Sequence, residues 1–389
     1  MKSTSIRTKV LAALSLCLLA AVGGTIALMR YSFEKNAQVL SAESVSESQK
    51  LFEILRAREI SKMTAVGAAL AANRELLAVY ESKDREKLLK YGEPMYTQLK
   101  GQGITNWVFH TREPEMAVFL RVHNPAKYGD QLNRSLTKKV VQSHGVESGN
   151  ELARAGFAVR VIRPLYDSRG EVTGYLELGE ELGQFIQAMK AQTGDDYGLL
   201  LGKKYLDRGL WADSSASWKR RDNWNDNADF VIADQTSSSG NLIQFSGQLG
   251  AIPKDGETLE RFQSGKSMFV RGMFPIQDAS GNTVGAMFVV RDISGFYWSM
   301  RNTQTMLVIL TVLALALSTI LILTMLGGLV FRRLDNIIAV ATRVVGGDYQ
   351  TEIRVSSNDE IGQFEKLFEQ FRKVFVDVLE NVPELQEKR

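Results

Sequence analysis

The chain has 389 residues, of which 44% are hydrophobic and 23% are charged, and it contains one cysteine and three histidines. Its 47 basic and 44 acidic side chains leave a net charge of +3, which lacks the strong basic excess expected of a nucleic-acid-binding protein. A single thiol excludes an intramolecular disulfide and a tetrathiolate zinc site, and the absence of a C-x-x-C-H sequence excludes covalently attached haem.

The first predicted element is a membrane-spanning helix at residues 10–29, which carry no charge. A helix of about 20 apolar residues is long enough to cross the hydrocarbon core of a bilayer. A cleaved signal peptide is the alternative, although the apolar run is longer than the roughly 7 to 15 residues typical of signal peptides. Whether the segment is cleaved stays open.

A second predicted span covers residues 302–331, since no charge occurs between Arg301 and Arg332. Basic residues precede the first span, within residues 1–9, and follow the second at Arg332 and Arg333. Because basic residues favour the cytoplasmic side, both termini are expected in the cytoplasm and the segment between the spans outside.

Residues 30–100 are expected to form a long helix followed by a second helix. They contain few Gly or Pro residues, and Leu51, Leu55 and Ile60 belong to an apolar pattern of helical period. From Gly101 the pattern changes to short alternating runs, which are typical of half-buried strands.

An internal repeat relates two strand-turn-strand segments, because residues 157–178 align without gaps onto residues 268–289, 111 positions later. Each copy contains a D-x-x-G turn, in which the Asp side chain bonds the turn backbone and the Gly supplies a positive φ. The repeat predicts two α+β modules of about 100 residues each. The identical pairs are Val159 and Val270, Arg160 and Arg271, Pro164 and Pro275, Asp167 and Asp278, Gly170 and Gly281, and Gly174 and Gly285.

This organisation resembles the extracytoplasmic double Cache sensors of bacterial chemoreceptors and sensor kinases. The resemblance is carried by the sequences VFHTREPEMAVFLRVHNPAKYGDQLN (108–133) and ARAGFAVRVIRPLYDSRGEVTGYLELG (153–179). It implies two tandem PAS-like modules with antiparallel sheets: a membrane-distal module at 101–203 and a membrane-proximal module at 204–301. It also implies a small-molecule pocket in the distal module.

Alternation within Ala117–His123 places the side chains of Phe119, Arg121 and His123 on one strand face. Arginine suits bidentate capture of a carboxylate, so the predicted ligand is a small organic molecule, with an anion as one option. For Arg160 a structural role is the alternative, because Arg271 repeats it. The predicted ligand-binding residues are Trp107, Phe109, Phe119, Arg121, His123, Tyr128 and Arg160.

Other chemistry is not favoured by the sequence. His110 and His123 match no zinc spacing, and they are interpreted as hydrogen-bonded or pocket-edge histidines. Asp130 is interpreted as the N-cap of a helix over 131–144, with a ligand role as the alternative. No nucleophile elbow, Walker loop or paired-carboxylate pattern is present, so no enzyme activity, cofactor or metal is expected.

The tail at 332–389 contains two heptad seams separated by a Gly-rich connector. It resembles the HAMP relay module, which implies a parallel four-helix bundle made by dimerisation. The first seam consists of Leu334, Ile338, Ala341 and Val345. The second seam consists of Ile361, Phe364, Phe368, Phe371, Phe375 and Val378.

Together these features predict a homodimeric, two-pass receptor of a bacterial inner membrane. Its α+β sensor would bind a small solute in the periplasm or outside the cell, and its relay would act on an output absent from this chain. Chemotaxis, as in methyl-accepting receptors, kinase signalling and cyclic-dinucleotide signalling stay open as pathways, as does whether the chain is truncated. The alternative function is a membrane-anchored scaffold that binds another protein.

Overall fold

The computed structural model describes residues 6–131, 134–153, 156–217, 219–237, 244–245 and 247–381. The chain divides into two compact units. The sheet unit is Glu34–Trp298, and the helical unit comprises the described parts of 1–33 and 299–389. The end of the predicted relay segment, 382–389, lies outside the described residues.

The expected long N-terminal helix is confirmed as α1, a single helix from Ile6 to Ala72. The expected second helix is two helices, α2 (Arg74–Glu81) and α3 (Arg85–Gly101). Each has a side-chain cap, because Asn73 Oδ1 accepts a hydrogen bond from the Leu76 amide and Asp84 Oδ1 accepts one from the Lys87 amide.

The first module is an antiparallel five-stranded sheet of order β2-β1-β5-β4-β3. The hairpin β4–β5 is the first copy of the repeat, and Gly170 adopts the expected positive φ of 82° in its turn. The strands are β1 (Asn106–Thr111), β2 (Val118–Arg121), β3 (Glu147–Ala153), β4 (Gly156–Tyr166) and β5 (Val172–Glu181).

The second module repeats this order as β7-β6-β10-β9-β8, which confirms the two tandem sheets. Strands β9 and β10 begin and end 111 residues after β4 and β5, in agreement with the sequence repeat. Because β6 pairs with β7 and β10, the boundary between the sheets precedes residue 196 instead of following residue 203. The strands are β6 (Asp196–Gly202), β7 (Phe230–Gln235), β8 (Glu257–Ser264), β9 (Ser267–Gln277) and β10 (Thr283–Asp292).

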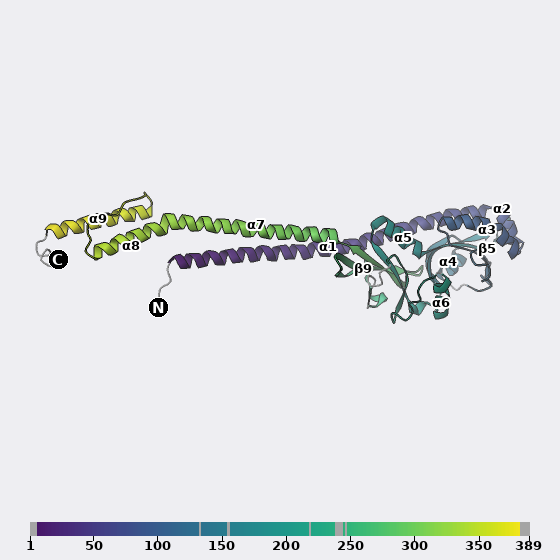
Figure 1. Ribbon diagram of the computed structural model, residues 1–389. Coiled ribbons are helices and arrows are strands. Elements are labelled where there is room, and N and C mark those ends of the chain that lie inside the picture. Colours follow the sequence, from purple (N-terminus) through teal and green to yellow (C-terminus); the bar gives the residue numbers. More distant parts are fainter. Residues whose placement is uncertain are drawn as a thin grey trace. The chain divides into compact units, whose positions relative to one another are not determined.

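One hydrophobic core joins the two sheets along α1, which passes both of them in the sheet unit (Figure 1). Phe52 on α1 contacts Phe185 of α5 (Leu182–Thr193) and Phe274 of β9. Helices α2 and α3 add Tyr80 and Leu88 to the same core. We call this side of the first sheet its helix face.

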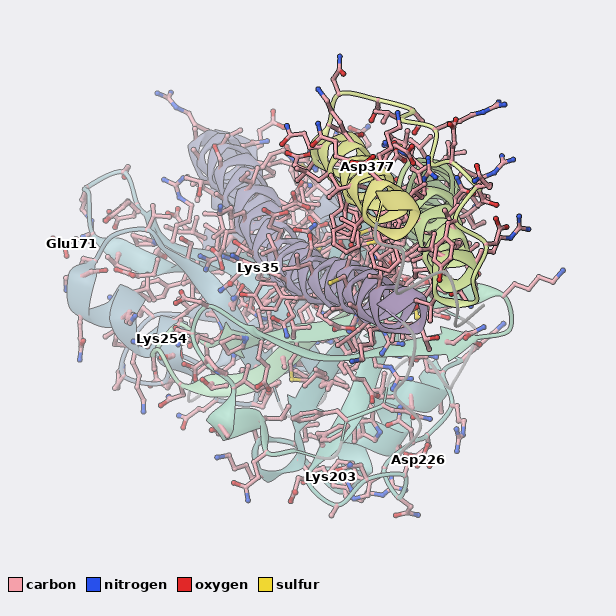
Figure 2. The ribbon with its side chains drawn as sticks, turned by 90° about the vertical axis from the view of Figure 1, so that its left-hand side faces the viewer. Lys35, Glu171, Lys203, Asp226, Lys254 and Asp377 are labelled. Carbon is pink, nitrogen blue, oxygen red and sulfur yellow. The ribbon has the colours of Figure 1, made fainter. Side chains whose placement is uncertain are left out.

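The opposite face of the first sheet is covered by α4 (Ser135–Ser143), and we call it the α4 face. Leu136 and Val140 of α4 pack there against Ile162 and Tyr175. The second module carries α6 (Arg208–Ser217) and short 3₁₀ turns at Lys203–Tyr205 and Leu249–Ala251. Exposed charged residues such as Glu171 and Asp226 lie at the periphery of the sheet unit (Figure 2).

Helix α7 (Ser294–Leu326) begins in the sheet unit and continues from residue 299 in the helical unit, which also contains a π-helical turn at Gly327–Phe331 and α8 (Arg332–Val345). A second long apolar stretch lies in α1, so the described chain has two helical segments long and apolar enough to cross a membrane. The most apolar window of each has 0% of its residues buried within the protein. Both are therefore suited to an apolar environment.

Most residues of the two predicted heptad seams do not pack between α8 and α9 of one chain. Helix α9 (Glu360–Asn381) packs on α8 through Ile337, Val340 and Val344, which are neighbours of the predicted first seam. The seam residues Ile338 and Val345 are 61% and 87% exposed. In the second seam Phe364, Phe371, Phe375 and Val378 are also exposed.

Candidate functional site

A group of charged side chains lies beneath α4 on the α4 face of the first sheet. Glu177 of β5 is paired with Val108 of β1 and Ile162 of β4, which places these three side chains on the same face. His110 and Arg160 lie two residues along β1 and β4 and therefore share it. We call His110, Arg134, Glu151, Arg160 and Glu177 the buried charge cluster.

Glu177 is the centre of this cluster and is 1% exposed. Its Oε1 accepts a hydrogen bond from Arg160 Nη1 at 2.7 Å, and its Oε2 accepts one from Arg134 Nη2 at 2.8 Å. His110 Nε2 lies 2.9 Å from Oε2. Burial opposes ionisation of Glu177, but the two arginine charges outweigh it and hold the pKa well below its usual range.

Glu151 of β3 is the second buried acid of the cluster. Its Oε1 accepts a hydrogen bond from the Leu136 amide in the first turn of α4 at 2.9 Å, and its Oε2 lies 3.1 Å from Arg134 Nη1. Burial raises the pKa of Glu151, although the charge of Arg134 acts against this. Arg134, the residue before α4, therefore joins the helix to both acids of the sheet.

The cluster retains unused hydrogen-bonding capacity. His110 Nδ1, Arg134 Nε and Arg160 Nε are buried and make no hydrogen bond, although Arg160 Nε lies 4.0 Å from Glu151 Oε2. Buried polar groups are normally paired, so these three nitrogens are available to bond water or a ligand. Because an Arg Nε can only donate, two of the three positions require a hydrogen-bond acceptor.

Three of the predicted ligand-binding residues lie on or beside the α4 face. Arg160 belongs to the cluster, and Arg121 is paired across β1–β2 with Val108 on the same face. His123 accepts a hydrogen bond from the Trp107 amide through Nδ1 at 3.2 Å. Burial lowers the pKa of His123 to about 4, and the charges of Arg160 and Arg121 act in the same direction.

The aromatic residues predicted to bind the ligand do not lie on the α4 face. Trp107 and Phe109 are fully buried in the core on the helix face, where Phe109 stacks on Tyr80 at 5.5 Å between ring centroids. Phe119 also contacts Tyr80, edge to face at 5.7 Å. The register shift between β1 and β2 breaks the strict alternation that had grouped Phe119 with Arg121.

Tyr128 and Asp130 also differ from expectation. Tyr128 is 57% exposed, and the guanidinium of Arg85 lies 3.5 Å from the centre of its ring. Helix α4 begins at Ser135, so Asp130 is not its N-cap. Asp130 instead makes a bidentate ion pair with Arg121, with distances of 2.7 and 2.8 Å.

Sequence reasoning missed Arg134, Glu151 and Glu177 as site residues, and it gave His110 only an edge position. The available signal was Glu177, a charged residue within a strand between Leu176 and Leu178. An acid at that position is either exposed or paired inside the protein, and the covering helix α4 makes it buried. Among the residues that the structure describes, no three His, Cys, Asp or Glu side chains are grouped to hold a metal ion.

Comparison with known proteins agrees with a sensory fold. Residues 44–223, just under half of the chain, match the dCache_3 family model, described as the double sensory domain of two-component sensor kinase. This match covers the first sheet and β6, and strands β7–β10 lie beyond it. A search of curated proteins finds no match.

Several solved sensor domains are similar to the chain at low identity. The periplasmic domain of Vibrio cholerae LuxQ is 12% identical, with a TM-score of 0.38, covering 66% of this chain and 99% of that one. The ligand-binding domain of Campylobacter jejuni chemoreceptor Tlp3 in complex with L-valine is 12% identical, with a TM-score of 0.36, covering 69% and 96%. The sensor domain of the V. cholerae histidine kinase DctB is 10% identical, with a TM-score of 0.38, covering 66% and 98%. Residues 44–223 are thus similar to a double sensory domain.

Proposed function

We propose that the chain is a membrane receptor that binds a small organic anion at the buried charge cluster of the first module. The observation that carries this proposal is the set of buried nitrogens on His110, Arg134 and Arg160 that make no hydrogen bond. A carboxylate is the preferred partner of a guanidinium, as the position of Glu177 between Arg134 and Arg160 illustrates. A ligand with an anionic acceptor group would satisfy donors that Glu177 leaves unused.

Charge balance within the cluster makes the proposed binding dependent on pH. Arg134 and Arg160 are offset by Glu177 and Glu151 when both acids are ionised, so a further buried anion requires compensation. Glu151 can supply it by taking up a proton, because burial has already raised its pKa. Affinity for the anion is therefore expected to increase as the pH falls.

In this proposal the receptor spans the inner membrane twice. The two apolar helical segments and the flanking basic residues support cytoplasmic termini and an external sheet unit. Topology can be tested with single cysteines at Ser143 and Lys366 in a Cys17→Ser background. A membrane-impermeant maleimide should label the Ser143 position in intact spheroplasts and the Lys366 position only after lysis. The reverse pattern would refute the proposed orientation.

The proposed relay is a dimer of α8 and α9 in the manner of a HAMP module. The exposed apolar seams support a second copy as the partner, since such stripes are normally covered. The relay would act on an output domain or partner of the chemoreceptor or sensor-kinase class. We propose no catalytic activity for either sheet module.

Ligand binding can be tested by thermal unfolding of the full chain in detergent, with a screen of organic acids, amino acids, amines and purines. A ligand present at 100 times its dissociation constant stabilises the native state by about 2.7 kcal/mol. We expect an acid to raise the unfolding temperature of the wild type and not of Arg160→Lys. The matched control is Arg271→Lys, at the repeated position in the second module, which should respond like the wild type. A screen without a stabilising compound would refute the proposal, and equal shifts in both variants would place the site elsewhere.

A further inference from the structure

The turn between β9 and β10 of the second module contacts the first module. The Ala279 amide donates a hydrogen bond to the Asn150 carbonyl at 2.8 Å, and Asn150 Nδ2 donates one to the Gln277 carbonyl at 3.1 Å. Lys139 Nζ donates to the Ala279 carbonyl at 2.5 Å, and Ser135 and Ser280 are hydrogen-bonded through their hydroxyls. Ala279 also packs against the apolar cluster beneath α4.

These contacts are made directly beside the buried charge cluster. Ser135 follows Arg134 in the chain, and Asn150 precedes Glu151. Arg134 and Glu151 are themselves ion-paired at 3.1 Å. A displacement of α4 or β3 when the cluster changes partners would therefore move the groups that hold the turn.

Hydrogen bonds within the turn hold it to its own hairpin. Asp278 Oδ1 accepts hydrogen bonds from the Ser280 and Asn282 amides, both at 2.9 Å. The repeated turn of the first module is built in the same way, because Asp167 Oδ1 accepts from the amides of Arg169 and Glu171. The turn of the first module is exposed. The turn of the second module, although similar in structure, contacts the neighbouring module.

The other end of the same hairpin holds the beginning of α7. Strand β10 ends at Asp292, and α7 begins at Ser294. The Ile293 amide donates to the Met268 carbonyl at 2.8 Å, and the Met268 amide donates to Ser294 Oγ at 2.8 Å. Trp298 Nε1 donates to the Lys266 carbonyl at 3.1 Å. The first turn of α7 is therefore bonded to the β9 end of the hairpin.

We propose that the β9–β10 hairpin couples the buried charge cluster to α7, with the turn Asp278–Gly281 as the contact that detects the state of the cluster. This inference rests on the proposed function, which gives the cluster its ligand and α7 its membrane position. A ten-residue strand such as β10 spans about 30 Å, so the hairpin is a direct connection between the two ends. Helix α1 offers the competing route, because it packs against both sheets.

The coupling can be measured without a ligand, by hydrogen exchange of the full chain in lipid nanodiscs. The Arg134→Ala variant perturbs the cluster. If the Arg134→Ala variant does not fold, Glu151→Gln is used in its place. The readout is exchange in peptides covering 291–298, which include the bonded amides of Ile293 and Tyr297. We expect exchange there to increase at least about fivefold, the lower end of typical coupling between sites.

The same perturbation is then made in two further backgrounds. Lys139→Ala/Ala279→Gly/Ser280→Gly weakens the contact of the turn, and Lys138→Ala/Ser168→Gly/Arg169→Gly makes matched changes beside it and in the repeated turn. The effect of Arg134→Ala on peptides 291–298 should fall by more than half in the first background and persist in the second. If Arg134→Ala changes exchange in peptides 291–298 equally in both backgrounds, the proposal is overturned in favour of a route through α1. The proposal is also overturned if Arg134→Ala increases exchange in α4 and leaves these peptides unchanged. A failed ligand screen would refute the proposed function and leave this result intact.

Discussion

Arg134 Nη2 lies 2.8 Å from Glu177 Oε2 and joins the residue before α4 to the middle strand of the first sheet. The two residues are 43 positions apart in the chain. Because Arg134 also pairs with Glu151, the cover helix and strands β3 and β5 share one set of charges. The position of α4 therefore depends on the charges beneath it.

Removal of the central acid should strongly destabilise the sheet unit. Glu177→Gln leaves Arg134 and Arg160 buried without their shared anion, and breaking a buried ion pair typically costs about 3–5 kcal/mol. Urea unfolding followed by tryptophan fluorescence measures this loss. Glu171→Gln in the exposed hairpin is the control, and its cost should stay below about 0.5 kcal/mol. Similar costs for both variants would show that the cluster does not hold the module together.

The two arginines predicted as ligand contacts should differ in their effect on stability. Arg121 pairs with Asp130, whose side chain is 52% exposed, and such ion pairs contribute about 0–1 kcal/mol. Arg160 binds the fully buried Glu177. We expect Arg160→Ala to lower the free energy of unfolding by several times the loss caused by Arg121→Ala, as measured by urea denaturation. Equal losses would contradict the assigned pairing.

The tandem modules could be predicted because their evidence is local. Asp278 and Gly281 fix one turn, and Asp167 and Gly170 fix the other. Each hairpin was therefore recognisable from a four-residue D-x-x-G motif. The 111-residue offset then placed β9 and β10 from β4 and β5. Turn chemistry acts over a few residues and is therefore visible in one sequence.

The site could be predicted only in part, because its partners are distant in the chain. Alternation in β1 separates Trp107 and Phe109 from His110, but it does not say which face receives the helices. The register shift at β2 removed Phe119 from its predicted group. Glu177 meets Arg134 only after α4 folds over the sheet, which no local spacing indicates.

Stability should fall with rising pH because of Glu180, which faces α1 from β5. Burial raises the pKa of Glu180 to about 7 from a usual value of 4.5; the charge of Lys62, whose Nζ lies 3.2 Å from Oε2, acts against this shift, and the neighbouring Glu59 carboxylate adds to it. Between these values the native state binds more protons than the unfolded state, so stability is lost as the pH rises from 4.5 to about 7. Glu180→Gln should therefore lose less stability than the wild type as the pH rises through this window.

The measurement for Glu180 is the free energy of unfolding at a series of pH values from 4.5 to 8. Lys62→Met is the informative second variant, because the lysine charge lowers the pKa of Glu180. Without it, the loss of stability should extend to higher pH. Parallel pH profiles for the wild type and Glu180→Gln would rule out this assignment.

His123 should make the protein less stable as the pH falls, which is the opposite of the pH dependence expected from Glu180. Burial lowers its pKa to about 4 from 6.5, so the unfolded state binds more protons between these values. The contribution of neutral His123 is complete above pH 6.5 and is lost as the pH falls toward 4. His123→Gln, which can still accept from the Trp107 amide, should resist acid better by about 2–3 kcal/mol. NMR of the histidine side chains measures the pKa of His123 in the folded protein. Titration of His123 near pH 6.5 would contradict this prediction.

Subunit contact in the proposed relay should be visible by disulfide crosslinking in membranes. Phe364 and Phe371 are 52% and 64% exposed on the same stripe of α9, whereas Lys373 is exposed on the other side of that helix. In a Cys17→Ser background, Phe371→Cys should form a disulfide-linked dimer on mild oxidation, because a parallel bundle brings equivalent seam positions together. Lys373→Cys should crosslink far less under the same conditions. If both positions crosslink equally or neither does, α9 does not pair through this seam, and the exposed phenylalanines must be covered by something other than a second copy of the chain.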